Sequence, residues 1–434
     1  MRWEIAMDHF QLRDGELHCE DVPLAEIAAA VGTPVYVYST ATMCRHVEAL
    51  KAALEPLRDP LIAYAVKANP HSAVIATLAR ADLGADVVSG GEYRRARAGG
   101  VPADKIVFAG VGKTEDEMIR ALDGGLYQFN LESLEEAEML SAVATAAGRT
   151  APVGFRVNPD VVAGGHAKIT TGAAENKFGI AIGEAPEAYA RIAALPGLSI
   201  QGVAVHIGSQ LTSLDPLERA FTRVGELIAT LRAAGHDIGV ADLGGGLGVP
   251  YDPGQPPPPS PADYGAMVKR VAGGWNVRLV FEPGRLIVAN AGVLLSRVIR
   301  VKPGATDPFV IVDAAMNDLM RPALYDAWHR IEAVRPTGKQ RTANVVGPVC
   351  ETGDTFATAR RMDEVEAGDL VVFRTAGAYA AAMASTYNSR PLTPEVLVDG
   401  GRWALVRPRI DVEKLIAMDV VPEWLAGCAD SPSS

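Results

Sequence analysis

Between residues 60 and 285, short apolar runs rich in β-branched residues alternate with longer Ala-rich stretches of helical period. Such runs are typical of buried strands, and apolar residues recurring about every 3.6 positions are typical of helices. The pattern predicts strands at 61–66, 85–88, 105–109, 126–130, 152–157, 200–207, 238–243 and 278–281. It predicts helices at 71–81, 91–98, 114–122, 133–147, 186–195, 216–234 and 261–272. Eight strands joined by helices indicate an α/β fold built as a closed (β/α)8 TIM-like barrel, although a doubly wound open sheet has the same periodicity.

The pattern changes after residue 292. Strand-like runs lack regular helices between them and predict a β-rich second domain, similar to a β-sandwich or a β-barrel, with strands at 292–301, 309–312, 344–349, 369–373 and 395–398. We expect the barrel to span 34–285, and residues 1–33 to join 286–434 in the second domain. The proline-rich segment 255–261 is expected to be a stiff loop over a barrel rim.

Composition narrows the function classes. The 434 residues are 48% hydrophobic and carry a formal net charge of −11, which argues against a nucleic-acid surface and does not favour a membrane surface. No apolar run is long enough to span a bilayer, and the start lacks an apolar signal core. Four scattered cysteines form neither a disulfide framework nor a zinc-site spacing, so no metal is expected. The expected location is the cytoplasm.

Polar residues follow several predicted strands at the point where each strand ends. Reacting groups of such barrels cluster at the C-terminal ends of the strands. Residues that obey this rule are Lys67, Asn130, His206, the Gly244-Gly245-Gly246 triplet and Glu282. Because those strand ends share one rim, we expect these side chains to form one site.

Lys67 ends the first of these strands, in Tyr64-Ala65-Val66-Lys67-Ala68-Asn69. Burial disfavours the charged form of a lysine, and a neutral amine can condense with an aldehyde. Lys67 is therefore a candidate Schiff-base residue. A lysine that caps a strand and extends to solvent is the alternative, and the other polar residues on the rim favour the first interpretation.

The glycine triplet and the segment after the eighth strand suggest a cofactor with a phosphate and a ring nitrogen. Glycine lets backbone amides approach an anion closely, and the triplet differs from the spaced pattern of a dinucleotide site, which favours a simple phosphate. Glu282 can keep a heterocyclic nitrogen protonated, and Arg285, three residues later, can bind a carboxylate with two hydrogen bonds. His206 can act as acid, base or a flat ring stacked on a cofactor.

The second domain contributes a second polar set. Arg321 and Tyr325 are four residues apart, so they share a helix face and can bind one anionic group. Cys350 and Glu351 follow an apolar strand and place a proton donor beside a receptor for an ammonium group. Tyr379 completes this set.

These motifs together resemble the fold-type III pyridoxal-phosphate-dependent decarboxylases, and within them the diaminopimelate decarboxylases. The resemblance covers nearly the whole chain, from Gly32-Thr33-Pro34 to Glu395-Val396-Leu397. It includes the Lys67 segment, Lys177-Phe178-Gly179, the glycine triplet and the Cys350-Glu351 pair. Thr352 stands where serine is commoner in the family, and the segment 164–175 differs from it.

The resemblance implies a role for each candidate. Lys67 would carry pyridoxal 5'-phosphate as a Schiff base, His206 would stack on its ring, and Glu282 would pair with the ring nitrogen. The phosphate would be held by Gly245, Gly246, Gly284, Arg285, Ser209 and Tyr379. The groups that bind the substrate's far end would be Arg285, Arg321, Tyr325, Tyr379 and Glu351. Cys350 would donate a proton, and family members are head-to-tail homodimers whose Cys-Glu segment reaches the partner's site.

The implied reaction converts meso-2,6-diaminopimelate to L-lysine and carbon dioxide, the last step of lysine biosynthesis. The far end of this amino-acid substrate is a zwitterion, which two arginines and Glu351 match in sign. Related decarboxylases acting on ornithine, arginine or carboxynorspermidine remain the alternative. An amino-acid racemase would not need the Cys350-Glu351 pair, and a non-catalytic homologue would not need Lys67, His206 and Glu282 together.

Overall fold

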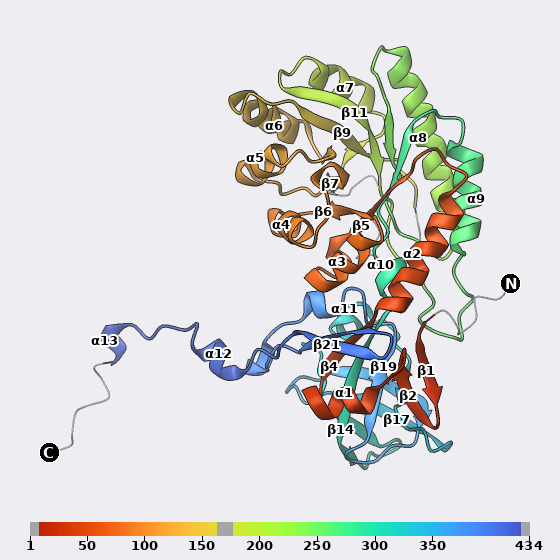
Figure 1. Cartoon of the computed structure of the whole chain (residues 1–434), viewed down its shortest axis with the longest axis vertical. Coiled ribbons are helices and arrows are strands. Elements are labelled where there is room, and N and C mark those ends of the chain that lie inside the picture. The colour runs from red at the N-terminus through yellow and green to blue at the C-terminus, as the bar shows by residue number, and fades with distance from the viewer. Residues whose placement is uncertain (1–7, 163–176, 427–434) are drawn as a thin grey trace.

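The computed structural model describes residues 8–162 and 177–426. The segment 164–175, singled out above, lies outside the described residues. The chain forms a barrel surrounded by helices and, below it in Figure 1, a smaller β-rich domain.

Eight parallel strands close the barrel, each hydrogen-bonded to its neighbours. They are β5 (Leu61–Ala65), β6 (Gly84–Val87), β7 (Ile106–Phe108), β8 (Gln128–Leu131), β9 (Ala151–Asn158), β11 (Leu198–Val205), β12 (Val240–Asp242) and β13 (Arg278–Phe281). The last strand pairs with the first through Val280 and Leu61, so the sheet is closed and the barrel prediction is confirmed. The short strand β10 (Ile180–Ala181), which was not predicted, pairs with β9 outside this ring.

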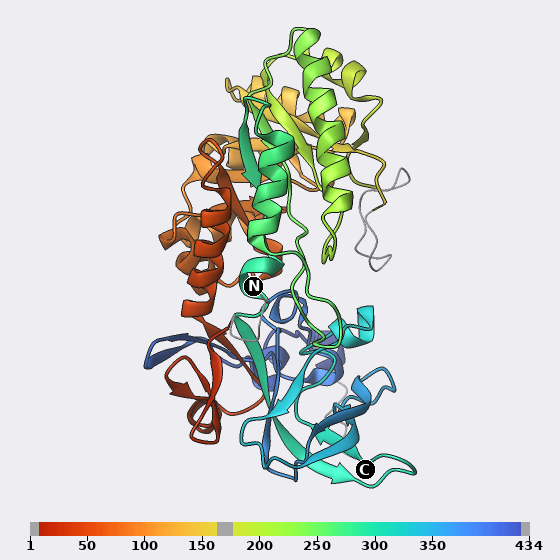
Figure 2. The same ribbon diagram turned by 90° about the vertical axis from the view of Figure 1, so that its right-hand side faces the viewer.

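Helices cover the outside of the barrel (Figures 1 and 2). They are α2 (Thr40–Leu54), α3 (Ser72–Arg80), α4 (Gly90–Ala98), α5 (Glu115–Asp123), α6 (Leu134–Ala146), α7 (Ala185–Ala193), α8 (Asp215–Ala233) and α9 (Pro261–Ala272). Local chemistry explains where several of them begin. In α9 the Ser260 side chain accepts from the Asp263 amide while Asp263 bonds back, and Pro261 occupies the first turn, where no amide donor is needed. The proline-rich loop therefore leads directly into a capped helix.

The second domain is built on a mixed sheet whose order is β18-β17-β15-β14-β4-β20-β21, with β19 paired to β14 and β16 paired to β19. Its strands are β14 (Gly292–Lys302), β15 (Phe309–Val312), β16 (Ile331–Ala333), β17 (Gln340–Val346), β18 (Thr355–Asp363), β19 (Leu370–Phe373), β20 (Glu395–Asp399) and β21 (Arg402–Arg407). The pattern did not predict β16, β18 and β21, and β17 begins earlier than expected.

The strand β4 (Val35–Ser39) corrects the expected start of the barrel at residue 34. It lies between β14 and β20 in the second sheet, and all five of its residues are buried. The chain therefore enters the barrel with α2, at residue 40. An apolar run predicts a buried strand but not its partners, which here lie more than 250 residues further along the chain.

The N-terminal segment packs on the second sheet. It forms β1 (Phe10–Arg13), β2 (Glu16–Cys19), β3 (Val22–Pro23) and α1 (Leu24–Val31). Phe10, Leu24 and Ile27 are buried in one hydrophobic cluster with Val293 and Val396 of the second sheet.

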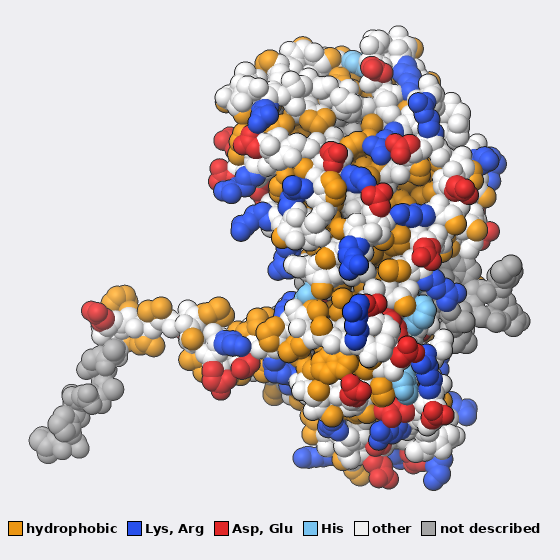
Figure 3. All heavy atoms as spheres, in the orientation of Figure 1, with side chains coloured by type: hydrophobic (Ala, Val, Ile, Leu, Met, Phe, Trp, Pro, Cys, Tyr) orange, Lys and Arg blue, Asp and Glu red, His pale blue; other side chains and the backbone are white. Residues whose placement is uncertain are grey.

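The far C-terminal segment projects from the body of the molecule (Figure 1). It contains α12 (Val412–Ile416) and α13 (Glu423–Ala426). Figure 3 shows hydrophobic side chains along this arm, whereas acidic and basic side chains are interspersed over the visible face of the body. Among the described residues, no helix is long and apolar enough to cross a membrane.

Candidate active site

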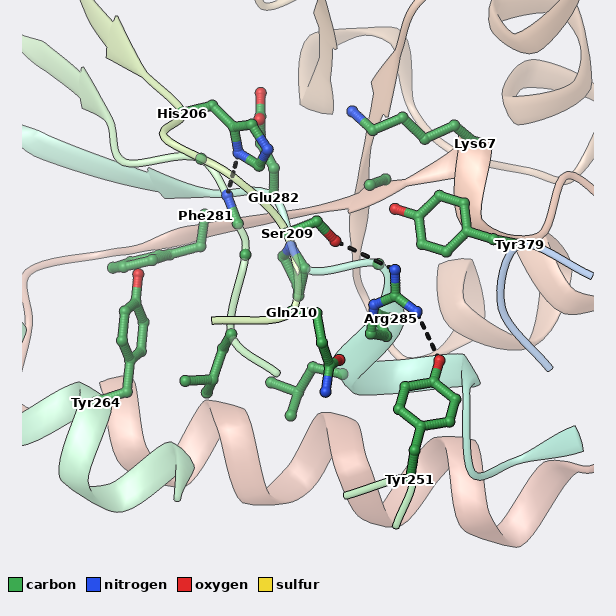
Figure 4. Close-up of a pocket in the computed structure, with 18 of the residues that line it drawn as sticks. Lys67, His206, Ser209, Gln210, Tyr251, Tyr264, Phe281, Glu282, Arg285 and Tyr379 are labelled. Atoms are coloured by element: carbon green, nitrogen blue, oxygen red, sulfur yellow. Dashed lines mark hydrogen bonds between the residues drawn. The ribbon is translucent and has the colours of Figure 1, made fainter. Parts of the chain in front are cut away.

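A cavity of about 410 Å³ lies at the C-terminal ends of the barrel strands and is closed on one side by the second domain. Figure 4 shows side chains from both domains pointing into it. The structure brings most of the predicted site residues to its wall: Lys67, His206, Ser209, Gly245, Gly246, Glu282, Gly284, Arg285, Arg321, Tyr325 and Tyr379. Residues from distant parts of the sequence thus meet in one place.

Cys350 and Glu351 are the two predicted site residues that do not line this cavity. Both are exposed, in the loop between β17 and β18. Asp354 holds the loop in shape because its carboxylate accepts from the amides of Met316 (2.7 Å) and Val349 (2.7 Å). The pair is therefore presented at the surface by a fixed turn, away from the cavity of its own chain.

Lys67 lies in the helical turn Val66–Ala68 that follows β5. Its Nζ donates to Oδ2 of Asp86 at 2.8 Å, and the Asp86 side chain is fully buried in β6. Burial by itself would lower the pKa of the Lys67 amine, but the carboxylates of Asp86 and Glu282 outweigh it and raise that pKa. Burial is therefore not sufficient to deprotonate Lys67, because the adjacent strand places a carboxylate beside the amine.

Glu282 and Asp242 form a buried carboxylate pair at the ends of β13 and β12. Asp242 accepts from Nδ2 of Asn130 (2.8 Å) and from the Gly244 amide (2.9 Å). Burial raises the pKa of Asp242 to about 6. Burial and the neighbouring Asp242 also raise the pKa of Glu282 well above its usual range. Oε1 of Glu282 is buried and has no hydrogen-bond partner among the described residues, so it is available to a ligand.

His206 follows β11 and presents a neutral ring to the cavity. Burial, with Arg156 and Lys67 nearby, lowers its pKa well below the usual value. The Gly245 amide donates to Nδ1 of the ring (3.2 Å; Figure 4), so the proton of the neutral ring is on Nε2. The imidazole is thus a flat, uncharged surface in the wall of the cavity.

The glycine triplet has no room for side chains. A Cβ at Gly245 would overlap the carbonyl oxygen of Glu282, and one at Gly246, which has φ +111°, would overlap that of Gly208. The backbone of the triplet can approach these carbonyl groups closely because Gly245 and Gly246 have no side chains. The sequence requirement for glycine is therefore steric.

Two buried arginines face the cavity from the helices α10 (Arg285–Val288) and α11 (Arg321–Tyr325). Arg285 and Arg321 are 7% and 6% exposed. Tyr251 lies beside both: its ring centroid is 5.7 Å from the guanidinium of Arg285 and 4.4 Å from that of Arg321. No acidic side chain of the described part of the chain forms an ion pair with either arginine. Buried charges are ordinarily paired, so the two guanidinium groups indicate an anionic ligand.

Arg285 also connects several predicted residues. Its Nη1 donates to the Tyr251 hydroxyl (2.6 Å) and its Nη2 to Oγ of Ser209 (3.3 Å) (Figure 4). The ring of Tyr379 lies 4.7 Å from its guanidinium. Ser209, Arg285 and Tyr379 thus form one polar wall.

Sequence reasoning missed several residues of the site. Asp86 and Asp242 are charged positions within apolar strand runs, and a charge in a buried strand is a signal that could have identified them. Tyr251 and Trp328 stand in irregular segments, where no periodicity indicates that they face the cavity.

Comparisons with known proteins agree with this geometry. A family model described as "Pyridoxal-dependent decarboxylase, pyridoxal binding domain" matches residues 40–289. The diaminopimelate decarboxylase of Zymomonas mobilis is 55% identical over 418 residues, which are 96% of this chain and 99% of the relative. That of Pseudomonas aeruginosa is 50% identical over 412 residues, 95% and 98% of the two chains. A solved diaminopimelate decarboxylase of M. jannaschii, in co-complex with L-lysine, is 35% identical with a TM-score of 0.92 over 97% of this chain and 100% of that one. The chain belongs to the diaminopimelate decarboxylase family of pyridoxal-dependent decarboxylases.

Proposed function

We propose that this protein decarboxylates meso-2,6-diaminopimelate to L-lysine and carbon dioxide with pyridoxal 5'-phosphate, in the cytoplasm. The observation that carries the proposal is the pair of buried arginines, Arg285 and Arg321, without acidic partners in a cavity that also contains Lys67. Family membership supports the same reaction.

The residues of the cavity fit pyridoxal phosphate. The unpartnered Oε1 of Glu282 can accept a hydrogen bond from a protonated ring nitrogen. The close-packed backbone at Gly245, Gly246 and Gly284, with Ser209 and Tyr379, suits a phosphate. When bound, this cofactor supplies an electron sink for the carbanion that the loss of carbon dioxide leaves.

Lys67, Asp86 and His206 have separate tasks in this proposal. The Lys67 amine attaches the cofactor, and Asp86, 2.8 Å from Nζ, is placed to take up the proton that the amine must lose. The neutral ring of His206 offers a flat surface for stacking and adds no positive charge. Glu282 lies near the carboxylates of Asp242 and Asp86, and it would keep a proton on the ring nitrogen of the bound cofactor.

The substrate's remote end sets the specificity. Arg321, Arg285 and Tyr325 bind its distal carboxylate, with Tyr379 alongside. A buried guanidinium without an acidic partner keeps its charge for such a group. The α-carboxylate of L-lysine is the group that is the distal carboxylate in the substrate. The M. jannaschii relative is in co-complex with L-lysine.

The distal ammonium and the last proton transfer need residues from a second chain. We infer a head-to-tail homodimer in which Cys350 and Glu351 of one subunit complete the partner's site. In support, both are exposed on a fixed turn and lie outside their own chain's cavity. Glu351 would face the ammonium, and Cys350 would give a proton to the carbon that has lost carbon dioxide.

Comparative turnover tests the substrate assignment. The protein, loaded with pyridoxal phosphate, is given meso-diaminopimelate, ornithine, arginine or carboxynorspermidine in parallel. We expect kcat/KM for diaminopimelate to exceed the others by at least about a hundredfold, since each alternative lacks a group that the site binds. Equal or higher kcat/KM for any of the other three amines would overturn the proposal.

A further inference from the structure

His329 is hydrogen-bonded to Arg321 and does not itself line the cavity. It follows α11 in the chain and is 2% exposed. Its ring also packs edge-to-face against Tyr251, with 5.4 Å between the ring centroids. The histidine therefore contacts both the arginine and the tyrosine that stacks on that arginine.

The partners of His329 determine which ring nitrogen carries the proton. Nδ1 is 2.8 Å from the Arg374 carbonyl oxygen, which can only accept, so Nδ1 must donate. Nε2 is 2.9 Å from Nη1 of Arg321, which can only donate, so Nε2 must accept. Both hydrogen bonds are made only by the neutral ring with its proton on Nδ1.

Further hydrogen bonds hold Arg374, the partner of Nδ1, and the backbone of His329. The Arg374 amide donates to the Arg330 carbonyl (2.9 Å), and its guanidinium bonds to the Phe10 carbonyl (3.0 Å) and to Asp8 (3.2 Å). The His329 carbonyl accepts from Nη1 of Arg360 at 2.9 Å. The imidazole is thus fixed at its backbone and at Nδ1, which leaves Nε2 in a set position.

An uncharged acceptor has a particular value at this place. A carboxylate behind Arg321 would orient the guanidinium equally well, but it would neutralise its charge and compete with an anionic ligand. A neutral imidazole orients the guanidinium and leaves its full charge directed at the cavity.

We propose that His329 is a positioning residue for substrate specificity: it holds Arg321 toward the cavity and keeps its charge available to the substrate's distal carboxylate. This inference rests on the proposed function, in which Arg321 binds that carboxylate. His329 itself touches neither substrate nor cofactor.

The test compares two ligands that differ only in that carboxylate, L-lysine and cadaverine. Equilibrium affinities are measured for the cofactor-loaded wild type and for His329→Leu, His329→Asn and His329→Gln. A glutamine can place its carbonyl oxygen where Nε2 lies, whereas an asparagine reaches only the Nδ1 position. We expect the Leu and Asn variants to bind L-lysine at least about tenfold more weakly with cadaverine affinity unchanged, and Gln to restore most of the affinity.

Kinetics with meso-diaminopimelate provide a second readout. Leu and Asn variants should raise KM about tenfold with a much smaller change in kcat, as expected for lost binding. Unchanged L-lysine affinity in the Asn variant, or an equal loss for L-lysine and cadaverine, would overturn the role of His329. If the Leu variant does not fold, the matched Asn and Gln pair decides. A wild-type protein inactive on meso-diaminopimelate would instead refute the proposed function.

Discussion

The ammonium of Lys67 lies 2.8 Å from the carboxylate of Asp86, so the ends of two adjacent barrel strands are joined by an ion pair inside the site. This pair stabilises the charged form of Lys67, which cannot attack an aldehyde. Attachment of the cofactor therefore requires proton transfer away from Nζ, and Asp86 is the nearest carboxylate to receive it.

Removing the Asp86 charge should shift the pH dependence of cofactor attachment. In Asp86→Asn the main group that raises the Lys67 pKa is lost, so the neutral amine is populated at lower pH. We expect the pH midpoint of attachment to fall by about one unit or more. Absorbance near ~420 nm, followed against pH after addition of pyridoxal phosphate, measures it.

Asp82→Asn is the matched control for this experiment. Asp82 forms an ion pair with Lys105 on the outside of the barrel and contacts no residue of the site. The midpoint should not move in that variant. A midpoint that stays unchanged in Asp86→Asn as well would show that the carboxylate does not control Lys67.

Arg321→Ala should weaken substrate binding more than cofactor binding. It removes a guanidinium that contacts Tyr251 and His329 in the part of the cavity assigned to the distal carboxylate. We expect KM for meso-diaminopimelate to rise at least about tenfold, with the affinity for pyridoxal phosphate within about twofold. Arg335→Ala, which removes a surface partner of Glu16, serves as control. Loss of cofactor binding with normal KM would contradict the assignment of Arg321.

Subunit mixing tests the shared site. Cys350→Ala alone should lower turnover far more than cofactor affinity, because a proton donor acts after the cofactor is in place. Lys67→Ala should be inactive. When the two variants are dissociated and mixed, a site built from both chains predicts recovery of about a quarter of wild-type activity, since half of the dimers then contain one intact site. A mixture no more active than its components would refute the shared site.

His329 should make the fold less stable in acid. Burial, with Arg321 nearby, lowers its folded pKa to about 3 from 6.5. Between these values the unfolded chain binds a proton that the folded chain does not, so the free energy of unfolding falls by about 1.4 kcal/mol per pH unit as the pH decreases. Urea unfolding at pH 6 and pH 5 should show a shallower pH dependence for His329→Gln, by about that amount. If the free energy of unfolding depended equally on pH in the wild type and in His329→Gln, the prediction would be contradicted.

The barrel could be predicted from the sequence because each strand and helix carries its own local period. The helices α3 to α9 begin and end within two residues of their predicted positions. The second domain was predicted less completely. In β18 only three of the nine residues are buried, and in β21 none is. Each of these strands also contains two arginines, so the apolar signal of both is weak. The strand β4 was assigned to the wrong domain because pairing with distant strands leaves no local trace.

Of the site residues, too, only some could be predicted from the sequence. Lys67, His206 and Glu282 end strands on one rim, so their meeting followed from the barrel alone. Tyr251 and His329 stand in irregular segments and act through contacts that only the folded chain reveals. The charge state of Lys67 also depended on a neighbour, Asp86, that lies 19 positions away in the sequence.

Chemical reduction followed by peptide mapping tests the central assignment most directly. The protein is incubated with pyridoxal phosphate, reduced with borohydride and digested, and the modified peptides are identified by mass. The account predicts one phosphopyridoxyl group per chain, on Lys67, and none in Lys67→Ala. Stoichiometric modification of another lysine, or none at Lys67 in the wild type, would contradict it.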